Sequence, residues 1–119
     1  MMKSKYFSKS EFKCGGKICY HKMNTGWIDM LDVARELAGV PFIITSSFRD
    51  TETNLKAGGK PNSAHLRGNA VDIACESSQD RILIIDALIM AGFNRIGVAK
   101  TFIHADIDEL LPQDVMWLY

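Results

Sequence analysis

Two short segments of the chain, 69–75 and 102–107, alternate apolar with polar residues, and this alternation constrains the fold more than any other feature. Successive side chains of a β-strand point to opposite faces of a sheet, so each segment predicts a strand with one apolar face. The two apolar faces, which should point into a core, consist of Val71, Ile73, Cys75, Ile103, Ala105 and Ile107. The opposite faces carry Asp72 on the first strand, and His104 with Asp106 on the second. If the two strands are neighbours, these three polar side chains can converge.

Short helices and further strands are predicted around this pair. Helices are expected at 25–38, 50–57 and 78–90, since each has a polar capping residue at its start and a glycine near its end. The apolar run 42–45 predicts a buried strand, and 95–99 predicts another. The last helix is apolar nearly all round its middle, so we expect it to be well buried. This mixture predicts an α+β domain with a small, mostly antiparallel sheet packed against helices.

Length and charge exclude several classes of protein. The chain has 119 residues, which suits one domain, and we expect a single domain over residues 1–119. Lys and Arg number 14, as do Asp and Glu, and a net charge of zero argues against a nucleic-acid binder or recruitment to an anionic membrane. The start has no apolar stretch typical of a secretory signal, and the longest apolar stretch, 82–91, is too short to span a bilayer. We therefore expect a soluble monomer that is synthesised in the cytoplasm.

The cysteines are three, an odd number that does not suit a disulfide framework, so a reducing compartment is expected. Cys14 and Cys19 with His21 offer only three metal ligands at an unusual spacing, and we expect them to be structural or incidental. Trp117 and Tyr119 are expected to pack a terminal strand onto the domain, although they could also line a groove.

The loop predicted at 60–68 and the two strands together supply a possible set of metal ligands. This loop contains His65, which can reach toward Asp72 and His104. Two imidazoles and a carboxylate are a standard ligand set for zinc, and three protein ligands leave a fourth position open for water, as in catalytic sites. Spacing alone leaves other roles open: a polar loop histidine, a satisfied strand aspartate and an exposed strand histidine.

The residues around His65 resemble a known family. Ser63-x-His65-x-x-Gly68-x-Ala70-x-Asp72 is similar to the signature of zinc D-alanyl-D-alanine carboxypeptidases and L-alanyl-D-glutamate endopeptidases, which share their fold with the hedgehog signalling domain. Further segments resemble small phage and bacterial members of that family, and together they cover nearly the whole chain: Tyr6–Phe12, Ile43–Arg49, Asn54, Gly58-Gly59 and Phe102–Asp106.

The resemblance implies roles for individual residues. It implies that zinc is bound by His65, Asp72 and His104. It also implies that Arg49 holds the substrate or stabilises an oxyanion, and that Ser63 contacts a substrate carboxylate. A guanidinium near the metal suits that role, because it can stabilise charge that develops in a tetrahedral intermediate.

The chain departs from the family pattern at one position. Active members usually carry Glu or Asp three residues before the last zinc histidine, where this chain has Thr101. Asp106, on the same strand face as His104, is the nearest substitute and either acts as the base or orients a ligand; we favour the second role. Asp50 and Glu52 are weaker candidates for the base.

Together, these features predict a zinc-dependent peptidase that hydrolyses peptide bonds of peptidoglycan stem peptides, bonds that involve a D-amino acid. A phage or prophage enzyme that acts on the cell wall after release by another protein would fit, and the lysines near the N-terminus could favour anionic wall polymers. The alternative is a catalytically inactive zinc-binding module of the same fold, which the absence of an acid at Thr101 favours.

Overall fold

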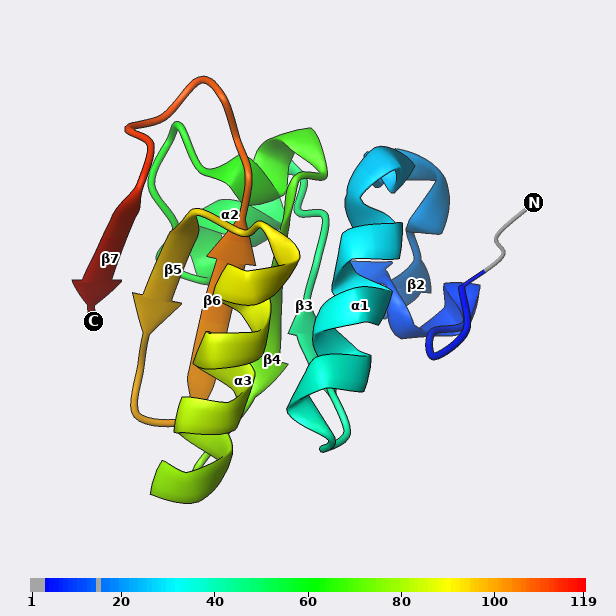
Figure 1. The fold of residues 1–119 in the computed structure, drawn as a ribbon. Helices are drawn as coiled ribbons and strands as arrows, with labels where there is room; N and C mark the ends of the chain where they lie inside the picture. The colour runs from blue at the N-terminus through cyan, green and yellow to red at the C-terminus, as the bar shows by residue number, and fades with distance from the viewer. Residues whose placement is uncertain (1–3, 15) are drawn as a thin grey trace.

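A five-stranded sheet organises the molecule in the computed structural model, which describes residues 4–14 and 16–119. The strands follow the order β3-β4-β6-β5-β7 (Figure 1), and all neighbours are antiparallel except the parallel pair β5 and β7. Their bounds are β3 Ile44–Ser46, β4 Ala70–Ala74, β5 Arg95–Val98, β6 Phe102–Asp106 and β7 Val115–Leu118. The predicted α+β class with a mostly antiparallel sheet is therefore confirmed.

Three α-helices flank the sheet. They are α1 Ile28–Ala38, α2 Thr51–Lys56 and α3 Ser78–Ala91. In Figure 1, α3 crosses in front of the sheet beside α1, while α2 lies behind it. Short 3-10 helices occupy Lys9–Glu11, Tyr20–Lys22, Thr25–Trp27 and Ala64–Arg67, and a small hairpin joins β1 Lys13–Cys14 to β2 Lys17–Ile18.

The core lies between the sheet and helices α1 and α3. Ile73 and Ile103 of the central strands are fully buried there, as are Leu31 of α1 and Leu88 of α3. The alternation of 69–75 and 102–107 therefore sorts the side chains as predicted, with the aliphatic residues on the core side. The other face of the sheet is free to carry polar side chains, and all the residues of the site described below project from it or lie over it.

Several sequence expectations need correction. β3 begins at Ile44 and is an edge strand, so Ile43 is 63% exposed instead of buried. α3 begins after Ser77, whose hydroxyl caps the amide of Asp80 at 3.0 Å. The same helix is not buried all round, because only one of its sides meets the core; Ile82, Leu83, Ile89 and Met90 are exposed.

The N-terminal segment contains a disulfide that counting cysteines did not predict. Cys14 and Cys19 are bonded, with their Cα atoms 5.8 Å apart, and this pairing ties β1 to the turn after β2. The odd cysteine, Cys75, is buried on the core side of the sheet as expected. In the described part of the chain, no helix is both long and apolar enough to cross a membrane.

Candidate metal centre

Strand pairing brings two of the three predicted metal ligands together. In the β4–β6 ladder Asp72 lies directly opposite His104, and the flanking pair Val71 and Ala105 points to the core instead. Side chains opposite each other in an antiparallel pair have Cβ atoms about 4.5–5.5 Å apart, which puts a carboxylate and an imidazole within reach. His104 Nδ1 and Asp72 Oδ1 are 3.0 Å apart.

The third predicted ligand, His65, comes from the short 3-10 helix η4, Ala64–Arg67, in a segment predicted to be a loop. Ser63 caps this helix, since its hydroxyl accepts the amide of His65 at 3.2 Å. Gly68 ends it with φ of +69°, and a Cβ there would lie 2.2 Å from the carbonyl oxygen of Lys22. The spacing of Ser63 and Gly68 in the signature thus has a local cause: one begins and the other ends the turn that presents His65.

The ligand atoms of His65, Asp72 and His104 all lie within 4.8 Å of one another, and all three residues are buried. His65 Nε2 is 3.2 Å from Asp72 Oδ1 and 3.2 Å from His104 Nδ1. Zinc bonds of about 2.0–2.1 Å in a tetrahedral arrangement separate donor atoms by about 3.3 Å, close to these spacings. The cluster therefore fits a zinc ion in both donor chemistry and spacing.

Each histidine is oriented through its other ring nitrogen. His65 Nδ1 donates a hydrogen bond to the carbonyl of the buried Ser47 at 2.6 Å, which leaves Nε2 as the nitrogen that can bind a metal ion. His104 Nε2 lies 2.5 Å from Asp106 Oδ2, which leaves Nδ1 free. Partners of this kind fix the tautomer of metal-binding histidines. Both of these nitrogens face Asp72 Oδ1, so one metal ion could bind all three atoms once the two nitrogens carry no proton.

Asp106 is fully buried, and both its carboxylate oxygens are engaged. Oδ1 accepts Arg95 Nε at 2.7 Å and the amide of Asp108 at 3.0 Å, and Oδ2 faces His104. Arg95 in turn donates to the carbonyl of Pro112. Sequence reasoning missed Arg95, although its position two residues before Gly97 on β5 places it on the same sheet face as His104.

Arg49 lies against the carboxylate of Asp72. Its Nη2 is 3.1 Å from Asp72 Oδ2, its Nε donates to Ser46 Oγ at 3.0 Å, and its Nη1 to Asn54 Oδ1 at 3.4 Å. The guanidinium is therefore held beside the cluster, as the sequence predicted, and Asn54 is a buried support that sequence reasoning did not assign. Gly59 makes room for this support, because a Cβ there would lie 2.0 Å from Asn54 Oδ1.

The charges of the cluster depend on one another. Burial alone would raise the pKa of Asp72, but hydrogen bonds with His104 and His65 hold that pKa well below its usual range. Burial alone would lower the pKa of His104, whereas its contacts with Asp106 and Asp72 raise it. Asp72 is thus a carboxylate at neutral pH, the form in which it can bind a cation.

The remaining predicted residues do not join the cluster. Thr101 is exposed in the turn before β6, and its carbonyl accepts the amide of Cys75 at 2.9 Å. Asp50 is used as the cap of α2, accepting the amide of Thr53 at 2.7 Å, and Glu52 pairs with Lys56 on the surface. None of these three therefore supplies a carboxylate to the cluster.

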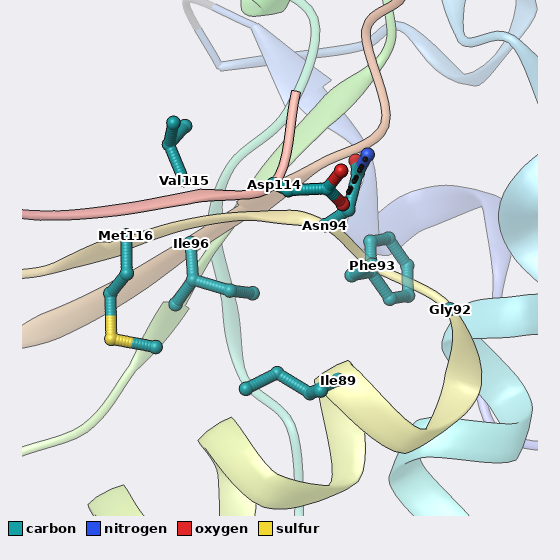
Figure 2. Close-up of a pocket in the computed structure, with 8 residues that line it drawn as sticks. All are labelled: Ile89, Gly92, Phe93, Asn94, Ile96, Asp114, Val115 and Met116. Carbon is teal, nitrogen blue, oxygen red and sulfur yellow. Dashed lines mark hydrogen bonds between the residues drawn. The ribbon is translucent and has the colours of Figure 1, made fainter. Parts of the chain in front are cut away.

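The opposite side of the sheet carries a separate groove. Figure 2 shows this groove, of about 370 Å³, between the end of α3 and strands β5 and β7. Its walls include Ile89 of α3, together with Ile96 and Met116 on the apolar side of the sheet. By strand alternation Ile96 and Met116 point away from the face that carries His104, so the groove is not part of the metal centre.

An α+β domain with a buried His-Asp-His cluster on the polar face of its sheet defines a class of metal-binding proteins that includes zinc hydrolases. A comparison with protein families matches the peptidase M15 model over residues 5–106, and the chain belongs to this family of zinc-dependent peptidases. A comparison with curated proteins found no match.

Proposed function

We propose that the chain is a zinc-dependent peptidase that hydrolyses peptide bonds of peptidoglycan stem peptides, at a bond that involves a D-amino acid. One observation carries the proposal: three buried ligand atoms lie within 4.8 Å of one another, and the guanidinium of Arg49 lies against one of these ligands, Asp72. The likeness of 63–72 to the carboxypeptidase and endopeptidase signature supports the choice of substrate. The enzyme would act on the cell wall after release by another protein.

His65, Asp72 and His104 would hold the zinc ion. When bound, zinc would polarise the scissile carbonyl and lower the pKa of a water molecule. Arg49 would place a positive charge beside the zinc ligand Asp72, where it could bind a substrate carboxylate or stabilise an oxyanion as charge develops. Ser63, at the start of η4, is the further candidate contact for the substrate carboxylate.

Asp106 would orient His104, the role favoured on sequence grounds. Its two oxygens already accept from Arg95, from a backbone amide and from His104, so it has little capacity to take a further proton from water. We infer that Asp106 keeps the proton of His104 on Nε2, so that Nδ1 stays available as a metal ligand.

A second candidate function is a zinc-binding module of the same fold that lacks catalysis. Two observations favour it: Thr101 is exposed and has no carboxyl group, and Asp106 is fully engaged. The two candidates share the metal and differ in turnover, so zinc binding and cleavage must be measured separately.

The test combines metal analysis with digestion of purified peptidoglycan, followed by mass spectrometry of the released peptides. If the chain is a peptidase, we expect one zinc per chain and new amino termini in the digested peptidoglycan, and both should be lost in His104→Ala. His21→Ala is the matched control, because His21 is an exposed histidine outside the cluster. Stoichiometric zinc without any released peptide would support the module, and absence of zinc binding would contradict both candidates.

A further inference from the structure

Five directly paired residues cross the sheet on the face that carries the cluster. Following the registers from β3 to β7, they are Ser46, Asp72, His104, Gly97 and Trp117. The predicted ligands Asp72 and His104 thus stand in the middle of a row. Arg49, bonded to Ser46, lies at one end of the row, and the indole of Trp117 lies at the other.

Gly97 allows Trp117 to approach the cluster. Strands β6 and β7 are separated by β5 and hence by about 10 Å, yet the rings of Trp117 and His104 have centroids only 5.3 Å apart. The indole therefore leans over β5 toward His104. A Cβ at Gly97 would lie 2.7 Å from Trp117 Nε1, so only glycine leaves room for this arrangement.

Tyr119 extends the aromatic surface. Its ring centroid lies 6.4 Å from that of Trp117 and 5.0 Å from that of Phe102. Arg95 holds the indole from another side, with its guanidinium 5.1 Å from the ring centroid. Tyr119 is nonetheless 68% exposed, so much of its side chain stays accessible to a ligand.

The geometry points to a substrate subsite formed by Trp117 and Tyr119, whose rings cover Gly97. This subsite binds uncharged methyl-bearing residues of the peptide on the side of the cluster away from Arg49. This inference rests on the proposed peptidase function. The two ends of the row differ in chemistry. The guanidinium of Arg49 at one end suits an anionic group, and the uncharged rings of Trp117 and Tyr119 at the other suit small apolar groups. Strand β7 lies beyond residues 5–106, the part of the chain that the family model matches.

The experiment compares two synthetic peptides, L-Ala-D-Glu-L-Lys-D-Ala-D-Ala and the same sequence with glycine in place of each alanine. For each methyl group that contacts the aromatic surface, the wild type should show a KM about fourfold lower than for its glycine counterpart. In Trp117→Ala this preference should fall to near unity with kcat little changed, and in Trp117→Phe it should largely persist. Gly97→Ala should behave like Trp117→Ala, because the new Cβ displaces the indole.

Leu118→Ala is the matched control, since Leu118 lies on the same strand, is 81% exposed and points to the opposite face. It should keep the wild-type preference. Zinc content is measured for every variant, and tryptophan fluorescence is followed as peptide is added to zinc-free protein. Trp27 is buried in the core, so quenching should come from Trp117 and be absent in Trp117→Phe.

The subsite is refuted if an active wild type shows a preference for the alanine peptide that Trp117→Ala and Gly97→Ala both retain. Loss of zinc from these two variants would also refute it, because Trp117 would then support the metal ligands rather than the substrate. A wild type that binds zinc and cleaves neither peptide would contradict the proposed function itself, and the subsite with it.

Discussion

Replacing Asp106 by asparagine should weaken zinc binding itself, and not only the catalytic step that depends on it. The amide oxygen of the substituted side chain can still accept Arg95 Nε and the amide of Asp108, so the new NH2 group is turned toward His104 Nε2. A donor facing Nε2 requires that nitrogen to be unprotonated, which moves the ring proton to Nδ1. Nδ1 is the atom that faces Asp72 and His65, so the substitution removes one metal ligand.

The size of the effect follows from the contacts that change. Loss of the group that orients a ligating histidine typically costs about 10–100-fold in metal affinity, and a full change of tautomer places the expected loss at about 100-fold. The substitution also leaves the buried Arg95 without its counter-charge, which costs up to about 3–5 kcal/mol of folding free energy. Unfolding in urea must therefore be measured beside zinc affinity, so that affinity is compared only among folded proteins.

The assay is competition for zinc against a chelator of known affinity, with Asp86→Asn as the control because Asp86 is exposed on α3. If Asp106 were the catalytic base, Asp106→Asn would bind zinc as the wild type does and lose only kcat. Such a result would refute the orienting role and restore Asp106 as the base. A loss of zinc affinity in Asp106→Asn but not in Asp86→Asn supports the orienting role.

Three further predictions concern the surroundings of the centre. Reducing the Cys14–Cys19 disulfide should lower the free energy of unfolding by about 2 kcal/mol, the chain-entropy value for so short a loop. Urea titrations with and without reductant measure this change, and in Cys14→Ser the two titrations should coincide. Burial alone would raise the pKa of Asp108, but hydrogen bonds led by Arg67 lower it. The stability that Asp108 adds to the folded protein should therefore be complete above about pH 4 and be lost as pH falls further. Asp108→Asn should flatten this pH dependence of the urea midpoint, and an unchanged slope would contradict the prediction. Gly59→Ala should displace Asn54 and hence Arg49, raising KM at unchanged zinc content, whereas Gly39→Ala, with open space around its Cβ, should leave KM as it is.

Much of the centre could be predicted because strand alternation is a local property. The pattern of 69–75 and 102–107 decides which side chains share a face, and the structure sorts Val71, Ile73, Ile103 and Ala105 to the core as predicted. Pairing between two distant strands is not local, so convergence of Asp72 and His104 was conditional on their being neighbours. The resemblance of 63–72 to a peptidase signature supplied that condition, and the β4–β6 ladder bears it out.

The errors have physical causes of the same kind. Composition shows that α3 is apolar, but exposure depends on how much neighbouring structure covers it, and only one of its sides meets the core. The cysteine count was odd because Cys75 is buried alone, which left Cys14 and Cys19 to pair across a hairpin. Arg95 escaped notice because a charged residue at the start of a strand gives no sign that it will be buried against Asp106.

Strand β7 illustrates the same limit at the site itself. Its residues are apolar on both faces, so alternation could not decide whether Trp117 packs on the core or faces the metal ligands. The parallel register with β5 decides it, by placing Trp117 opposite Gly97 and therefore in line with His104. A glycine in mid-strand weakens a sheet unless something else occupies its space. Here the indole does so, which connects the absence of one side chain on β5 to the proposed recognition of substrate by another on β7.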